Sequence, residues 1–544
     1  MNKLYYGDNL EILRDKIDSE YIDLIYLDPP FQSGKDYNII FKPETHKING
    51  ATAQIHTFED TWKWGTEPEK EFEGLITASI TREKPNQKII ELMKAMRAYL
   101  TECSMFAYLC MMAPRLLELK RVLKKTGSIY LHCDPTASHY LKLLMDAIFG
   151  VENFQNEIIW QRTNAHNSPA KQFCRLHDDV LFYTKTSSAI WHTLRTDYSP
   201  EQLKRYKEDE NGRLYTGQDL TITQRHGERN RFEWRGAKPP SGRAWAFSKD
   251  RLDELWNQGL ILPKLDGSPR LDGLKVYLDE KKGKPLGTIW NDIKRVGNTS
   301  RERLGYPTQK PEALLERIIS ASSNEGDIVL DPFCGCGTAV AVAESLNRRW
   351  IGIDVTYLAI DVIKKRLEKN GIKEGEKFEI EGEPTDVYSA KKLAEKDPFQ
   401  FQIWCITKID ATPSERTGGD EGVDGIINYL GFDRKGSAGK GVIQVKGTKT
   451  VSPSMVRDLK GTMKSQSAEF GILVTLKKPT PGMKNEALKE GTYEFGRKKI
   501  PRIQLITVED LFKEHIPLIL PANIVEPYKK PRITKKTQQK FSLD

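Results

Sequence analysis

The stretch that decides the fold runs Asp327-Ile-Val-Leu-Asp-Pro-Phe-Cys-Gly-Cys-Gly-Thr338. It predicts a short buried strand, a glycine loop and then a helix. Gly335 and Gly337 would let the backbone turn tightly and approach a ligand closely. The N-terminus of the following helix adds free N–H groups and partial positive charge. Because a glycine pair also occurs in ordinary strand-to-helix turns, the loop alone indicates only a candidate nucleotide site.

The sequence after the loop narrows the class of ligand that the loop could bind. The next predicted strand ends at Asp354, about 20 residues further on, where a carboxylate can accept both hydroxyl protons of a ribose. The loop does not follow the GxxxxGK[ST] pattern, which disfavours a nucleoside triphosphate. Cys334 and Cys336 are interpreted as small residues that fill space within the loop.

A second motif stands near the N-terminus, where Asp23-Leu-Ile-Tyr-Leu-Asp-Pro-Pro-Phe31 predicts a buried strand that ends in Asp28, Pro29, Pro30 and Phe31. The prolines stiffen the loop and remove N–H donors. Asp28 and the Pro29 carbonyl can then accept both hydrogens of one aromatic –NH2 group. Two acceptors favour a pyramidal nitrogen whose lone pair is available to attack an electrophilic methyl. Phe31 offers a flat surface for an extruded base. The alternative, a proline-rich turn capped by Asp28, is disfavoured by the glycine loop.

The chain divides into zones of different composition. Residues 1–368 alternate strand-like and helical segments, which predicts an α/β domain, interrupted by a polar insertion at 163–285 that is rich in Gly, Trp and Arg. A charged linker is expected at 369–398. A second, smaller α/β segment follows at 399–515, and a basic tail at 516–544.

Composition excludes several classes of protein. The chain has 544 residues, 38% of them hydrophobic, without an apolar run long enough for a membrane helix or a signal peptide, so a cytoplasmic protein is expected. Its seven cysteines contain no CxxC pair, which disfavours disulfides and zinc. The net charge of +9 is modest, but 225–243 holds five arginines interleaved with Phe232 and Trp234. That mixture suits phosphate contacts and stacking on bases, although a solvated face is the alternative.

With these motifs in place, residues 1–368 resemble the amino-methyltransferases of DNA in their beta arrangement, in which the catalytic DPPY/F motif precedes the cofactor motif and a target-recognition region lies between them. Tyr306–Pro311 (YPTQKP), Gly7–Asn9, Leu131–Pro135 and Asn156–Arg162 resemble further family elements. The resemblance implies a Rossmann-like, seven-stranded, mostly parallel sheet that binds S-adenosylmethionine. It also implies double-stranded DNA as the partner, and a homodimer is an open expectation because many relatives dimerise. The cofactor residues that it implies are Asp8, Thr308, Lys310, Asp331, Phe333, Gly335, Gly337, Thr338 and Asp354.

The target atom is expected to be N6 of adenine. Methylation of carbon 5 needs a cysteine in a Pro-Cys dipeptide, and the sequence contains none. Family members with Ser-Pro-Pro-Tyr tend to modify cytosine N4, whereas an aspartate at that position, here Asp28, favours adenine. Cytosine N4 remains the alternative, and RNA is disfavoured because the large insertion resembles those of duplex readers. His132 and His139 are interpreted as structural, since the chemistry requires no base.

The C-terminal segment carries a second candidate site. Asp424 opens one predicted strand and Gln444-Val445-Lys446 lies on the next, so that Asp424, Gln444 and the Val445 carbonyl could bind Mg²⁺. Lys446 would polarise water or stabilise charge on a phosphate. The alternative is an ordinary hairpin with surface Asp and Lys.

Residues 399–515 resemble the Mrr-type branch of the PD-(D/E)xK nucleases. Gln444 stands where PD-(D/E)xK nucleases usually carry an acid, but Mrr-type sequences also carry a glutamine there, so the departure does not exclude cleavage. Gln402 stands where relatives often carry a glutamate. The glutamine lowers the negative charge and with it the expected metal affinity. Two hypotheses follow. One is a single-chain restriction-modification enzyme, and the other is a methyltransferase whose nuclease-like domain only binds DNA.

Overall fold

The computed structural model describes residues 1–30, 37–41, 53–58, 63–164, 171–223, 230–297, 299–306, 308–414, 422–430, 438–448 and 450–525. The chain forms two compact units. The first contains Met1–His192 and the described residues from Thr288 to Val525, and the second contains Thr193–Gly287. Each unit is described by itself.

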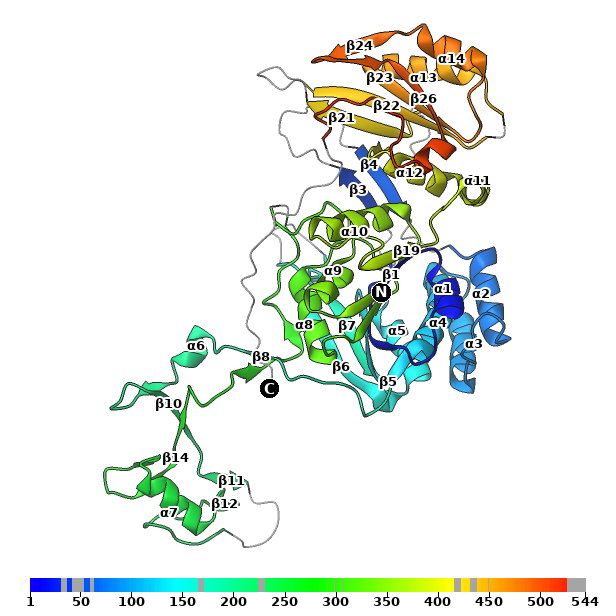
Figure 1. Ribbon diagram of the computed structural model, residues 1–544. Coiled ribbons are helices and arrows are strands. Elements are labelled where there is room, and N and C mark those ends of the chain that lie inside the picture. The colour runs from blue at the N-terminus through cyan, green and yellow to red at the C-terminus, as the bar shows by residue number, and fades with distance from the viewer. Residues whose placement is uncertain are drawn as a thin grey trace. The chain divides into compact units, whose positions relative to one another are not determined.

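A nine-stranded sheet forms the centre of the first unit (Figure 1). Its strands, in spatial order, are β16 (Ile289–Trp290), β6 (Phe154–Gln161), β7 (His177–Thr184), β5 (Leu123–Cys133), β2 (Ile22–Leu27), β17 (Ile328–Asp331), β18 (Arg349–Asp354), β1 (Asn2–Tyr6) and β19 (Phe378–Glu381). Among these described strands β7 alone runs antiparallel to its neighbours. The sheet is therefore mostly parallel, as expected.

The expected count of seven strands is too low for this sheet. Strands β6 to β1 in the spatial order make up seven, and β16 and β19 extend the sheet at its two edges. These edge strands are two and four residues long, which is too short to give an alternating hydrophobic signal. β19 and α11 (Val387–Lys396) also occupy the segment 369–398 that reads as a linker in the sequence.

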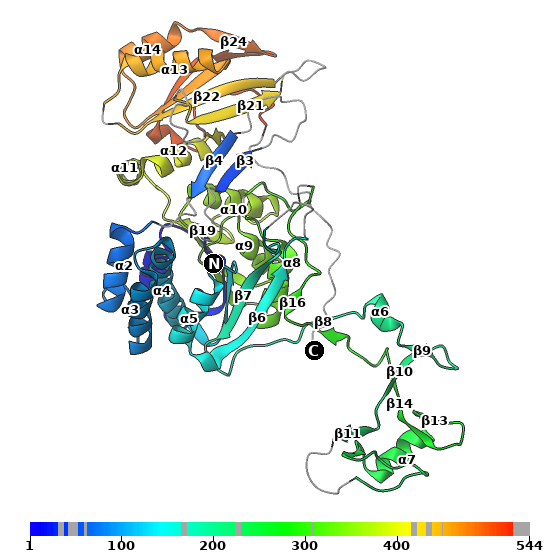
Figure 2. The same ribbon diagram turned by 180° about the vertical axis from the view of Figure 1, so that it is seen from behind.

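Helices cover both faces of the sheet (Figure 2). The cluster on one face includes side chains of α1 (Asn9–Lys16), α2 (Thr66–Ile76), α3 (Gln87–Leu100), α4 (Ser104–Val122) and α5 (Ser138–Phe149). The cluster on the other face includes side chains of α8 (Glu312–Ser322), α9 (Thr338–Ser345) and α10 (Tyr357–Lys369). Both faces are thus sealed from water, and the ends of the strands remain for a site.

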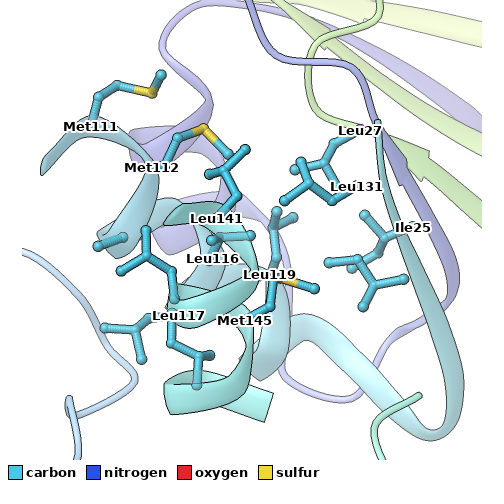
Figure 3. Close-up of a cluster of buried hydrophobic side chains, with 14 of the residues drawn as sticks. Ile25, Leu27, Met111, Met112, Leu116, Leu117, Leu119, Leu131, Leu141 and Met145 are labelled. Carbon is cyan, nitrogen blue, oxygen red and sulfur yellow. The ribbon is translucent and has the colours of Figure 1, made fainter. Parts of the chain in front are cut away.

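Alternation along β2 explains this arrangement. Ile25 and Leu27 point into the first cluster, whereas Leu24 and Tyr26 point into the second. Figure 3 shows Ile25 and Leu27 facing side chains of α4 and α5. A strand that is buried on both faces reads as a continuous hydrophobic run, which is why this segment is recognisable in the sequence.

The C-terminal part of the first unit holds a five-stranded sheet in the order β20 (Thr412–Pro413), β21 (Gly425–Leu430), β22 (Ala438–Lys446), β23 (Phe470–Thr475) and β26 (Ile503–Thr507). β22, β23 and β26 are parallel to one another, and β20 and β21 are joined antiparallel. Around this sheet lie α12 (Pro398–Thr407), α13 (Pro453–Ser465), α14 (Pro481–Leu488), the hairpin of β24 (Thr492–Phe495) and β25 (Lys498–Pro501), and the 3-10 helix Val508–Phe512. A separate hairpin comprises β3 (Tyr37–Phe41) and β4 (Ala53–Phe58), and a second 3-10 helix spans Val151–Asn153.

The second unit is a small, mostly antiparallel body. Its elements are β8 (Arg195–Thr196), α6 (Pro200–Leu203), β9 (Lys207–Glu208), β10 (Leu214–Gln218), β11 (Thr221–Thr223), β12 (Arg243–Trp245), α7 (Lys249–Asn257), β13 (Ile261–Pro263), β14 (Pro269–Tyr277) and β15 (Lys284–Pro285). Its core includes the buried rings of Trp234 and Trp245 with Leu252 of α7. The second unit begins at Thr193, which is later than the expected start of the insertion at residue 163. The difference arises because β7 belongs to the main sheet.

No helix among the described residues is both long enough and apolar enough to cross a membrane.

Candidate active sites

The glycine loop lies between β17 and α9. Gly335 and Gly337 have φ angles of +48° and +71°, in the left-handed region that favours glycine. A Cβ on Gly337 would lie 2.6 Å from Cγ1 of Ile363, so a larger residue cannot fit unless the Ile363 side chain moves. The loop therefore requires glycine for its backbone and for its packing.

Asp354 closes the loop from the neighbouring strand. Its Oδ2 accepts a hydrogen bond of 2.9 Å from the Gly335 N–H, and its Oδ1 accepts from the N–H and the hydroxyl of Thr356 at 2.9 and 2.8 Å. Burial raises the pKa of the Asp354 carboxyl above its ordinary value, although these donors oppose the effect. The carboxylate is thus held in one orientation at the end of β18, where the sequence predicts a ribose.

A buried arginine holds the segment that follows β1. Arg115 of α4 donates to Oδ2 of Asp8 at 2.8 Å and to Oδ1 of Asn9 at 2.7 Å, and it also pairs with Glu71. Asp8 in turn caps α1. The sequence analysis missed Arg115, and the only available signal was a charged residue within an apolar helix.

Both motifs open into one cavity of about 280 Å³. Asp28, Pro29 and Pro30 follow β2, and Asp331 ends the adjacent parallel strand β17. The carboxyl ends of parallel strands meet at one edge of a sheet, which is where such sites form. The predicted residues that line this cavity are Asp8, Asp28, Pro29, Pro30, Thr308, Lys310, Asp331, Phe333, Gly335, Thr338 and Asp354. Gly337 lies in the loop itself, and Phe31 lies outside the described residues.

The two sides of the cavity are joined by Lys310. Its ammonium donates to Oδ2 of Asp28 at 2.5 Å, and its backbone carbonyl accepts from the Thr338 hydroxyl at 3.3 Å. Asp331 is buried beside this pair, and burial raises the pKa of its carboxyl well above the ordinary value. The cavity therefore contains an ion pair next to a carboxyl group that resists ionisation.

Beneath the cavity lies a buried polar chain. The Tyr26 hydroxyl is 2.9 Å from Nδ1 of His132, whose Nε2 is 3.3 Å from Oδ2 of Asp178. His132 is fully buried, whereas His139 is exposed on α5. Tyr26 lines the cavity, and His132 contacts the Tyr26 hydroxyl. The histidine therefore supports a residue of the cavity wall.

The second candidate site lies on β21 and β22. Oδ1 of Asp424 accepts from the side chain of Gln402 at 2.8 Å, and Oδ2 accepts from the Val445 N–H at 2.6 Å. Gln444 donates to the Gly422 carbonyl at 2.7 Å and to the Thr462 hydroxyl. Its Oε1 is buried and has no hydrogen-bond donor within the described part of the chain.

The oxygen atoms of Asp424 and Gln444 fit a weak site for a divalent cation. One carboxylate from Asp424 and one unsatisfied amide oxygen from Gln444 are ligands that Mg²⁺ accepts, with water in the remaining positions. No group of three or more His, Cys, Asp or Glu side chains suited to a metal occurs among the described residues. Lys446 is half-buried at the end of β22, two residues beyond Gln444.

The first site lies in an α/β fold, and the glycine loop after β17 and the segment Asp28, Pro29 and Pro30 share one cavity there. Residues 22–365 match the family model described as DNA methylase, and residues 393–514 match the one described as restriction endonuclease. Because the first match spans more than half of the chain, the protein belongs to the DNA methylase family, and its C-terminal part is a restriction endonuclease domain of the second family.

Several individual proteins are similar to parts of the chain. The chain is 30% identical to the Type II methyltransferase M.EcaI of Enterobacter cloacae over 368 residues, which are 67% of this chain and 69% of the relative. It is 43% identical to the DNA adenine methyltransferase YhdJ of Escherichia coli strain K12 over 129 residues, or 22% of this chain and 42% of that protein. The solved M1.HpyAVI–SAM complex is similar over 68% of this chain and all of that one, with 17% identity and a TM-score of 0.29.

Proposed function

We propose that the first site transfers a methyl group from S-adenosylmethionine to N6 of adenine in double-stranded DNA. The observation that carries the proposal is the shared cavity, which has Asp28 and Pro29 on one wall and the Gly335 loop with Asp354 on the other. The name of YhdJ, a DNA adenine methyltransferase, supports the choice of base.

The residues of the chain suit this chemistry. Asp354 would accept the ribose hydroxyl protons, and the glycine loop would lie against the methionine portion of the cofactor. S-adenosylmethionine, when bound, supplies the electrophilic methyl group. Asp28 and the Pro29 carbonyl would accept the two amine hydrogens, which makes the nitrogen lone pair available. After transfer of that methyl group from sulfur to nitrogen, the nitrogen would release one proton to solvent water.

Product analysis tests this proposal directly. DNA methylated by the purified protein is digested to nucleosides, and the modified nucleoside is identified by mass spectrometry. N6-methyladenine is expected, and Asp28→Ala should lower the rate at least about 100-fold because an oriented polar partner of the reacting group is lost. N4-methylcytosine would favour the alternative target. Methylation of RNA but not of DNA would contradict the proposal.

We propose that the second unit reads the target sequence. Arg235 lies over the ring of Trp256 at 5.0 Å, and the exposed Arg231 adds positive charge on the same segment. Such a surface suits phosphate contacts and stacking. Arg231→Ala should weaken DNA binding and reduce its salt dependence, measured as the slope of log Kd against log salt. An unchanged slope would argue against a phosphate contact.

We further propose that the C-terminal domain cleaves DNA with Mg²⁺. Asp424 and Gln444 would hold the ion, and Lys446 would stabilise charge on the phosphate. Incubation of unmethylated plasmid with Mg²⁺ should give cut product, which Asp424→Ala and Lys446→Ala abolish while methylation persists. Lys464→Ala, on the exposed end of α13, is the matched control. If wild type and variants all fail to cut, the second candidate is favoured, namely a domain that only binds DNA.

The domain assignment follows from these proposals. Residues 1–368 form the methyltransferase, with 369–398 connecting it to the nuclease domain at 399–515 and a basic tail at 516–544, of which 526–544 lie outside the described residues. A homodimer is the proposed assembly, and light scattering of the purified chain would test it.

A further inference from the structure

The environment of Lys310 suggests a role that the cofactor assignment does not cover. The lysine lies in the segment before α8, yet its ammonium contacts Asp28, which is 282 positions away in the chain. The side chains of both residues are largely buried, at 9% and 16% exposure. An ion pair in such a place loses the hydration of both partners, so its geometry matters more than that of a surface pair.

The backbone of Lys310 is fixed from the cofactor side. The Thr338 hydroxyl at the start of α9 donates to the Lys310 carbonyl at 3.3 Å. Two residues earlier, Thr308 has a φ angle of +58°, an uncommon conformation for a residue other than glycine. The segment is thus bent toward the cavity and attached to the helix that follows the glycine loop.

The contact with Lys310 involves only one of the two carboxylate oxygens of Asp28. Lys310 binds Oδ2. Oδ1 accepts no hydrogen bond from a described residue, and Asp28 and Pro29 line the cavity together. Among the described residues, this oxygen and the Pro29 carbonyl are therefore the acceptors that the Asp28-Pro29 segment offers to an incoming amine.

We infer that Lys310 is a positioning residue that fixes the rotamer of Asp28, so that one carboxylate oxygen is held by the lysine and the other faces the target amine. This inference rests on the proposed methyl transfer and adds a specific requirement to it. Without the ammonium, the carboxylate can rotate about its χ angles, and the amine loses a fixed acceptor. The other charged or titratable groups that line the cavity would remain in place, namely Asp8, Tyr26, Arg115, Tyr306, Asp331, Cys334, Cys336 and Asp354.

The test separates positioning from cofactor binding. Lys310→Met keeps the length of the side chain and removes its charge. The single-turnover rate at saturating S-adenosylmethionine and DNA should fall about 100-fold, the cost expected when a reacting group is misplaced by about 1 Å. The Kd for S-adenosylmethionine, measured by calorimetry, should change less than threefold. Lys310→Arg, which can also pair with a carboxylate, should recover most of the rate.

Two controls make the result specific. Lys124 pairs with Asp23 at the other end of β2, with both Nζ–O distances at 2.8 Å, and Lys124→Met should leave the rate unchanged. In an Asp28→Asn background, Lys310→Met should cause no further loss, because a residue that acts only through Asp28 has nothing left to orient. A thermal unfolding scan of each variant confirms that it is folded.

Other outcomes would overturn the inference. If Lys310→Met raises the Kd for the cofactor but keeps the saturated rate, Lys310 is a cofactor ligand only. If the two substitutions lower the rate independently, the lysine does not act through Asp28. A wild-type protein that makes no methylated base would instead refute the proposed function itself, so the two failures are distinguishable.

Discussion

The side-chain amide of Asn9 donates a hydrogen bond of 2.8 Å to the backbone carbonyl of Pro332, across 323 positions of sequence. Asn9 also accepts from Arg115, so it links the first turn of α1 to the loop after β17. The cofactor cavity is lined by both segments. This one side chain therefore helps to set the distance between two walls of the cavity.

Removing that link should weaken cofactor binding. Asn9→Ala leaves the Pro332 carbonyl and one Arg115 donor without partners, which costs about 1–3 kcal/mol in a buried site. Calorimetry should show a Kd for S-adenosylmethionine raised roughly tenfold, given that about 1.4 kcal/mol corresponds to a factor of ten. Asn86 makes a similar bond to the Ala147 carbonyl away from the cavity, so Asn86→Ala should leave the Kd unchanged. An equal effect of both substitutions would contradict the prediction.

Cofactor affinity should also fall at low pH because of Asp354. Its carboxyl must be ionised to accept hydroxyl protons, and burial raises its pKa above the ordinary value of about 3.9. Protonation therefore begins at a higher pH than for an exposed aspartate, and below that pKa the affinity should fall by up to about tenfold per pH unit. Binding titrations between pH 8 and pH 5 check this. Asp354→Asn should bind weakly and lack this pH dependence.

Asp331 should destabilise the fold at alkaline pH. Burial raises the pKa of its carboxyl in the folded state well above the value in the unfolded chain. The folded protein then binds this proton more strongly, so the free energy of unfolding decreases as pH rises between the two pKa values. Asp331→Asn removes that term and can still accept from the Phe333 N–H. The Tm of the variant relative to wild type should increase from pH 5 to pH 8, and a difference independent of pH would refute the idea.

A further prediction concerns the contact between Gln402 and Asp424 in the nuclease domain. Gln402→Glu would place a second negative charge against Asp424, where the glutamine now donates a hydrogen bond of 2.8 Å. Like charges at this distance repel, so the Tm should fall without metal. Added Mg²⁺ should restore it, because two carboxylates bind the ion better than one. Gln402→Ala also loses the bond but adds no charge, and its Tm should respond to Mg²⁺ less than that of Gln402→Glu, because only Asp424 and Gln444 remain to hold the ion.

Elements with long, regular patterns could be predicted from the sequence. The strand and the helix predicted on either side of the glycine loop correspond to β17 and α9. Hydrophobic periodicity and glycine spacing are local properties, so one sequence contains them in full. The same holds for Asp28 at the end of β2.

Contacts between distant segments could not be predicted in the same way. The pairing of Lys310 with Asp28 depends on how two loops meet, and nothing in either motif encodes it. Arg115 was missed because its partners lie in other elements. Strand β7 was assigned to the insertion, since its place in the sheet is set by antiparallel pairing with β5 and β6.

The pairing of the two short strands β8 and β15 has a consequence for how enzymes of this kind could acquire new target sequences. Lys284 pairs with Thr196 and Pro285 with Arg195, so the two ends of the second unit emerge side by side. A segment with adjacent ends can be exchanged by recombination as a single cassette. If it reads DNA as proposed, a new cassette would bring a new target sequence to an unaltered reaction centre, and the host genome would acquire a different methylation pattern in one genetic event.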